Sequence, residues 1–136
     1  MNGMPAETKR ALLIAAAVIF AAAMIWLLIL ESHSYTRAVC NRLNEFGYRV
    51  SPSDLYSQGY GSNASISELI EEDISLAKEL SQKAGFGADT ETKGRVELLL
   101  YSVSDKEVMY IWLLDRQPQL VFIEDMENGS IRSITE

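Results

Sequence analysis

The sequence predicts an α+β protein with an N-terminal transmembrane helix that continues into a stalk helix, then one helix and a 3-4-stranded antiparallel β-meander. Residues 11–30 carry no charged side chain. Apolar residues then recur at helical spacing in two segments. The last third of the chain changes to short runs rich in Val, Leu and Tyr, separated by tight turns that permit only antiparallel pairing. Helices followed by a meander indicate the α+β class.

These observations divide the 136 residues into a cytoplasmic tail (1–10), a transmembrane helix (11–30) and an extracytoplasmic α+β domain (31–136). Apolar residues make up 48% of the chain, which excludes a disordered protein. The net charge of −7 has the wrong sign for a nucleic-acid partner. A single Cys and a single His exclude an internal disulfide and a Cys/His zinc site. We therefore expect no cofactor and no metal.

Residues 11–30 supply the roughly 20 apolar residues that a bilayer core requires, so we expect membrane lipid to surround them. Lys9 and Arg10 stand immediately before this segment and Glu31 follows it, which predicts a cytoplasmic N-terminus and a single pass. Trp26 lies one turn from the outer end, a position that suits an indole at the headgroup layer.

A cleaved signal peptide is the alternative interpretation of this segment. Its apolar region spans about 7–15 residues, whereas the run here continues for seven residues past the small residues at 21–23. A lipoprotein signal also fails, because Arg37 stands three residues before Cys40, where such signals carry Leu. The pattern favours an uncleaved anchor.

The stalk helix is predicted by four apolar residues at spacings of four, four and three: Tyr35, Val39, Leu43 and Phe46. Gly47 is well placed to end it. Residues 53–64 are rich in Gly and Ser and predict a loop. A second helix is predicted over residues 65–84, because Ser65 and Glu68 form a capping box and an apolar stripe follows them.

Four strands are predicted, over residues 95–104, 108–115, 120–124 and 130–134, with an Asn-Gly hairpin before the last. The second strand is apolar on both faces, since Tyr110 and Trp112 alternate with Met109 and Ile111. An open antiparallel sheet usually has one solvated face, so we expect both faces to be covered. The helix over 65–84 can cover one of them.

Two arrangements of the stalk remain open for the other face. The stalk folds back onto the sheet, or it projects and leaves an apolar surface for a protein partner or a second copy of the chain. The residues of this expected interaction surface are Tyr35, Val39, Leu43, Phe46, Tyr110 and Trp112.

The sequence shows no catalytic constellation, and we expect no enzyme. His33 and Cys40 lie two helical turns apart, about 10.5 Å, too far for a nucleophile–base pair. The acidic run at residues 71–73 is explained by the start of a helix. The acidic residues at 124–127 lack the later Glu of a calcium loop.

Three short phrases resemble the uncharacterised single-pass membrane proteins of clostridial-type Gram-positive bacteria, whose exported part is a domain of unknown function. The phrases are Phe46-Gly47-Tyr48-Arg49-Val50, Gln82-Lys83-Ala84-Gly85-Phe86 and Leu113-Leu114-Asp115. The chain departs from the family pattern at one place, where Phe122-Ile123-Glu124-Asp125 stands in the position of a Gly-Gly-Asp-like motif. The resemblance implies the location and the fold, and it implies no catalytic residues.

The sequence thus predicts a membrane-anchored, extracytoplasmic, non-catalytic protein-interaction module of the bacterial cell envelope. One alternative is a small envelope enzyme or ligand-binding domain whose polar site comes from residues 51–64. Another is a pilin-like structural subunit, although residues 11–30 lack the Glu that pilin processing requires.

Overall fold

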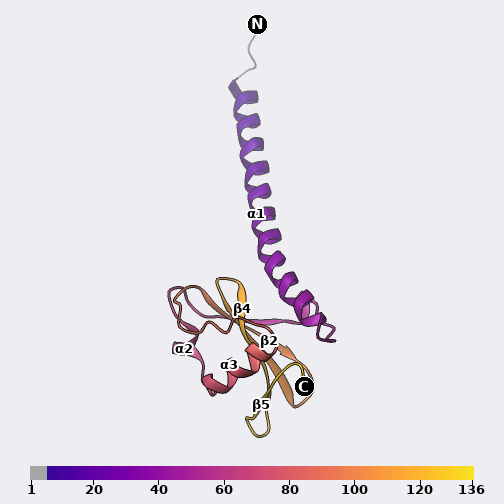
Figure 1. The fold of residues 1–136 in the computed structure, drawn as a ribbon. Coiled ribbons are helices and arrows are strands. Elements are labelled where there is room, and N and C mark those ends of the chain that lie inside the picture. The colour runs from indigo at the N-terminus through magenta and orange to yellow at the C-terminus, as the bar shows by residue number, and fades with distance from the viewer. Residues whose placement is uncertain (1–5) are drawn as a thin grey trace. The chain divides into compact units, whose positions relative to one another are not determined.

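The computed structural model describes the backbone of residues 6–136 and the side chains of residues 6–27 and 35–136. It confirms the α+β class, with an N-terminal apolar helix, shorter helices and an antiparallel sheet (Figure 1). The chain divides into two compact units, Met1–Ser34 and Tyr35–Glu136, which are described separately.

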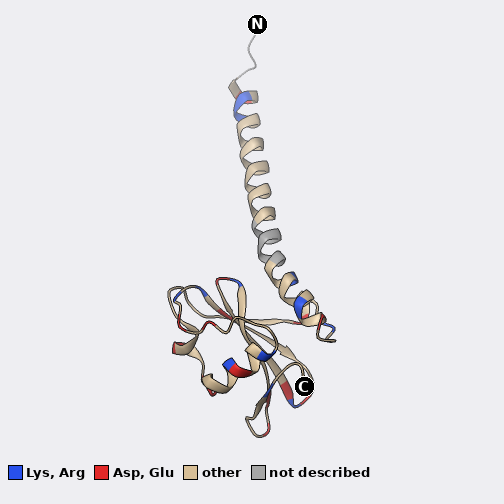
Figure 2. Cartoon of the chain, viewed as in Figure 1, with Lys and Arg blue, Asp and Glu red and all other residues tan. Residues whose placement is uncertain are grey.

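The first unit contains the apolar part of helix α1 (Ala6–Asn44). The segment Ala6–Leu27 has a mean hydropathy of 2.3 and is long and apolar enough to cross a membrane. Figure 2 shows the cations at its start in blue, followed by a run without charge. Lys9, Arg10 and Trp26 are exposed along this helix. Glu31 and His33 lie outside the residues whose side chains are described.

The second unit is built on a five-stranded sheet in which every neighbouring pair is antiparallel and the spatial order follows the chain. Its strands are β1 (Tyr56–Gly59), β2 (Val96–Ser102), β3 (Glu107–Leu114), β4 (Gln117–Asp125) and β5 (Ile131–Arg132). The sequence missed β1, which was expected to be loop. All four of its residues are exposed, so no burial alternation marks it as a strand.

The turn between β3 and β4 is tighter than the expected turn over residues 116–119. Asp115 and Arg116 have φ values of 49° and 67°, the two left-handed residues of a type I′ turn. Strand β4 consequently begins at Gln117 and takes up Pro118, where the register with β3 shifts. A proline is tolerated at such an irregularity because no regular ladder hydrogen bond is lost.

The predicted helix over residues 65–84 is broken into α2 (Ile66–Leu69) and α3 (Ile74–Lys83). Ile70 is extended, and the Asp73 carboxylate accepts hydrogen bonds from the N–H groups of Ser75 and Leu76 at 3.0 and 3.2 Å. The expected cap at Ser65 makes no side-chain capping bond. A new helix start at Asp73 therefore interrupts the continuous helix that the apolar stripe predicted.

Each face of the sheet has its own core. The last turns of α1 cover one face, where Val39 and Leu43 are buried against β2, β3 and β4. Helices α2 and α3 cover the other face, which includes Trp112. The stalk therefore packs on the sheet within its own chain.

The structure places the residues of the expected interaction surface in the two cores or beside them. Val39, Leu43 and Trp112 are buried, and Tyr35, Phe46 and Tyr110 are half-buried and pack against the two cores. The stalk stripe covers the sheet face that carries Met109 and Ile111, whereas Tyr110 and Trp112 lie on the opposite face.

Candidate functional site: an acidic groove

Two adjacent cavities lie over the sheet face that carries α2 and α3. Their volumes are about 470 and 360 Å³, and they share Glu71 and Glu72. We call them together the acidic groove. Its polar and aromatic lining residues are Gln58, Tyr60, Glu71, Glu72, Asp73, Tyr110, Trp112, Glu124 and Ser130. Cavities of this size are typical of ligand sites.

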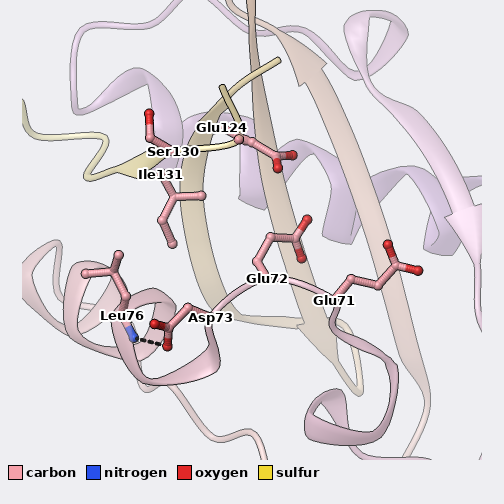
Figure 3. Close-up of a pocket in the computed structure, with 8 residues that line it drawn as sticks. Glu71, Glu72, Asp73, Leu76, Glu124, Ser130 and Ile131 are labelled. Atoms are coloured by element: carbon pink, nitrogen blue, oxygen red, sulfur yellow. Dashed lines mark hydrogen bonds between the residues drawn. The ribbon is translucent and has the colours of Figure 1, made fainter. Parts of the chain in front are cut away.

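The break between α2 and α3 places the carboxylates of the groove. Because residues 70–73 leave the helix, Glu71 and Glu72 lie in the linker between α2 and α3, where both line the groove. Figure 3 shows the carboxylates of Glu72 and Glu124 directed to the same side of the pocket, with Asp73 turned away to cap α3. None of the described residues that line the groove is basic.

The potential in the groove is negative, and two pKa values respond to it. Burial raises the pKa of Glu72, and the charges of Glu124 and Glu71 add to the increase. Burial also raises the pKa of the Tyr110 hydroxyl, as do its hydrogen bond to Glu124 and the nearby glutamates. A cation in the groove would relieve this repulsion, so the groove favours a positively charged group.

Aromatic rings form the apolar wall of the groove. The rings of Tyr60 and Trp112 stack with centroids 5.4 Å apart, and Tyr110 packs against Phe122 at the same distance. The indole Nε1 of Trp112 is buried and has no acceptor among the described residues. A buried donor without a partner costs about 1–3 kcal/mol, and this one belongs to a residue of the groove wall.

The structure places the residues of the expected interaction surface in two separate locations. Tyr110 and Trp112 line the groove, whereas Val39 and Leu43 lie under the opposite sheet face. The six residues of the expected interaction surface are thus divided between two faces, because the stalk packs on the β3 face that carries Met109 and Ile111, and Tyr110 and Trp112 point to the other face.

Sequence reasoning missed the meeting of the two acidic runs. It treated residues 71–73 as a helix start and the acidic residues at 124–127 as an incomplete calcium loop, yet Glu72 and Glu124 line one cavity. Asp125 instead accepts the Glu127 N–H at 2.8 Å within the turn. Among the described residues, no group of three or more His, Cys, Asp or Glu side chains could hold a metal ion. Of residues 51–64, Gln58 and Tyr60 reach the groove.

Comparison with known proteins adds no identification. No family model, curated protein or solved structure matches the chain. The function is therefore inferred from the residues of the groove.

Proposed function

We propose that this chain is a membrane-anchored, non-catalytic binding module of the bacterial cell envelope. The apolar helix holds it in the cell membrane, with the N-terminus in the cytoplasm and Tyr35–Glu136 outside. The acidic groove binds a basic segment of a partner protein. The observation that carries this proposal is the groove's lining, which has glutamates, aromatic rings and no Lys or Arg among its described residues.

The chemistry of the groove fits a guanidinium or ammonium side chain. Glu72 and Glu124 would pair with the cation, and charge-assisted hydrogen bonds of this kind are about twice as strong as neutral ones. The faces of Tyr60 and Tyr110 favour a nearby cation through their ring quadrupoles. The volumes of the two cavities and their aromatic wall favour a basic side chain of a peptide over an isolated metal ion.

Binding of a short peptide of alternating arginine and glycine tests the groove, with the full chain in detergent micelles. Glu72→Gln should weaken binding about 10-fold, because one charge-assisted contact is worth about 1.5–3 kcal/mol. Binding should strengthen as pH rises through the raised pKa of Glu72, since the ionised carboxylate binds the cation. Isothermal titration calorimetry measures both effects.

The same variant should raise the melting temperature slightly at pH 7. A raised carboxyl pKa means that Glu72 favours folding below its unfolded pKa and loses this contribution as pH rises through its folded pKa. Glutamine mimics the protonated form, and the gain stays below about 1 kcal/mol at a partly exposed site. Glu79→Gln is the matched control, an exposed glutamate of α3 outside the groove. Equal binding by both variants would overturn the proposal, as would equal affinity for a glutamate-glycine peptide.

The proposed orientation rests on Lys9 and Arg10, which directly precede the apolar segment. The orientation needs a test of its own, because Arg37 and Arg42 follow the apolar segment at a greater distance, so that cations stand on both sides of it. Ser62→Cys introduces an exposed thiol, whereas Cys40 is 2% exposed and burial raises its pKa. A membrane-impermeant maleimide added to intact cells should label the Ser62→Cys variant and leave the wild type unlabelled. Labelling of the variant only after lysis would reverse the orientation.

A second candidate function is supported by the position of Glu72 and Glu124, which line the same cavity. Two carboxyl groups in one cavity can act as general acid and general base, as in glycoside hydrolysis. Release of reducing sugar from envelope glycan by the wild type, and its loss in both Glu72→Gln and Glu124→Gln, would favour this candidate over peptide binding.

A further inference from the structure

An open edge of the sheet lies beside the acidic groove. Strand β1 is the first strand in the spatial order, and β2 is its only neighbour among the described strands. Gln58 of β1 and Tyr60, which follows the strand directly, line the cavity of about 360 Å³. The side of β1 that faces away from β2, which we call the β1 edge, therefore borders the site proposed for the peptide.

The hydrogen bonds between β2 and β3 establish which way the backbone groups of β2 point. In an antiparallel pair, hydrogen-bonded residue pairs alternate with pairs that are not hydrogen-bonded. The Val103 N–H donates to the Glu107 carbonyl at 3.0 Å, just beyond one end of the ladder. The Asp115 N–H donates to the Arg95 carbonyl at 2.8 Å, just beyond the other end. The odd-numbered residues of β2 therefore bond to β3, and the even-numbered residues bond to β1.

The register between β1 and β2 then identifies the backbone groups of the β1 edge. Tyr56 and Gln58 are paired with even-numbered residues of β2, so their N–H and C=O groups point into the sheet. Ser57 and Gly59 consequently direct theirs away from it. In the part of the chain that the structure describes, no hydrogen bond reaches the outward groups of these two residues. The β1 edge thus presents donors and acceptors in the spacing of a strand.

The β1 edge lacks the features that normally block a sheet edge. Proteins protect such edges with a charged side chain, a proline or a very short strand. The other end of the sheet is protected in this way, because β5 has two residues and ends in Arg132. Strand β1 has four residues, Tyr-Ser-Gln-Gly, with neither charge nor proline. It is therefore the end of the sheet that can accept a further strand.

The side chains of an added strand would be sorted by the faces of the sheet. Residues that lie opposite each other in neighbouring strands share a face. Tyr56 and Gln58 lie opposite Leu100 and Leu98, which belong to the core on the groove side. Added residues opposite Tyr56 and Gln58 would therefore lie on the groove side. Tyr56 is 64% exposed, which leaves its ring open to a cation.

We propose that the basic peptide binds as an additional antiparallel strand on the β1 edge. Antiparallel pairing already joins every neighbouring pair in this sheet, and it is slightly more stable per residue than parallel pairing. Ser57 and Gly59 supply the main-chain hydrogen bonds. Every second side chain enters the groove beside Gln58, in the cavity that Glu71 and Glu72 also line. The partner is thus an extended segment with Lys or Arg at alternate positions.

This inference rests on the peptide binding proposed above, and its test separates the two. The full chain in detergent micelles is titrated by calorimetry with three forms of the arginine-glycine peptide. One is unmethylated, one has sarcosine in place of every glycine, and one has N-methylarginine in place of every arginine. In the proposed register the glycines lie opposite Ser57 and Gly59 and exchange hydrogen bonds with them, whereas the arginine N–H groups point to solvent.

We expect the sarcosine peptide to bind about 10-fold or more weakly than the unmethylated peptide, because its backbone hydrogen bonds are lost. The N-methylarginine peptide should bind within about 3-fold of the unmethylated one. Equal affinities of the two methylated peptides, or the reverse order, would overturn the strand addition even if Glu72→Gln weakens binding as expected. Failure of the unmethylated peptide to bind would refute the groove itself.

Ser57→Pro tests the same pairing from the side of the protein. It removes an outward N–H and should weaken binding of the unmethylated peptide about 10-fold. The melting temperature should be unchanged, because proline is tolerated where an edge N–H faces solvent. Ser57→Ala is the matched control, which keeps the N–H and should bind like the wild type. If sedimentation showed a dimer of the wild type that Ser57→Pro abolishes, the β1 edge would belong to a second copy of the chain, contrary to the proposal.

Discussion

Replacing Leu43 by aspartate should destabilise the Tyr35–Glu136 unit by about 4 kcal/mol or more, because it combines a lost core side chain with a buried charge. Leu43 is 1% exposed and packs under the sheet face formed by Met109, Ile111 and Leu113. Domains of this size have a total stability of about 5–15 kcal/mol. The substitution should therefore remove roughly a quarter or more of the total stability and lower the urea concentration at which the unit unfolds. Urea unfolding followed by near-ultraviolet circular dichroism measures the change.

Met126→Asp is the control for this substitution, since Met126 is an exposed apolar residue in the turn after β4. We expect it to change stability by less than about 0.5 kcal/mol. If Leu43→Asp unfolded at the wild-type urea concentration, the stalk would not be part of the core. The covered sheet face would then need another partner.

Ser81→Ala should cost about 2 kcal/mol, although it removes a single oxygen atom. The Ser81 side chain is fully buried, and its Oγ donates to the Ala77 carbonyl at 2.7 Å and accepts the Val121 N–H at 2.9 Å. Without the hydroxyl, a buried amide of β4 has no acceptor, and such a group costs about 1–3 kcal/mol. Hydrogen exchange of the Val121 amide and urea unfolding measure the effect.

Ser75→Ala is the matched variant, because Ser75 lies on the same helix and is exposed. Its effect should stay within about 0.5 kcal/mol. An unchanged exchange rate at Val121 in Ser81→Ala would contradict the idea that this serine joins α3 to β4.

The strands and the stalk could be predicted because their patterns are local. Strands β2, β3 and β4 are long, and their apolar residues continue on both faces, so neither face could be solvated. The stalk stripe was also predicted, and Val39 and Leu43 pack as such a stripe requires. The spacing of the stripe did not reveal what the stripe packs against, because the same apolar residues would be needed to cover a sheet or to bind a partner.

The features that the sequence did not predict depend on competition between local structures or on contacts between residues far apart in the chain. The break at residues 70–73 arises because the Asp73 cap competes with continuation of a helix, and the apolar stripe alone does not reveal it. Strand β1 is held by backbone pairing with β2, which side-chain periodicity does not record. The acidic groove joins Glu72 to Glu124, 52 positions further along the chain (124 − 72). Only the fold brings these two side chains together.

The inclusion of residues 35–44 in the core limits which proteolytic fragments of this chain can stay folded. A protease that cuts before Tyr35 would release a fragment that retains all of its packed side chains. A cut after Asn44 would leave Val39 and Leu43 behind, and losing such side chains costs about 2–5 kcal/mol each. That sum is comparable to the whole stability of a domain of this size. Any stably folded fragment of this unit must therefore begin before Val39.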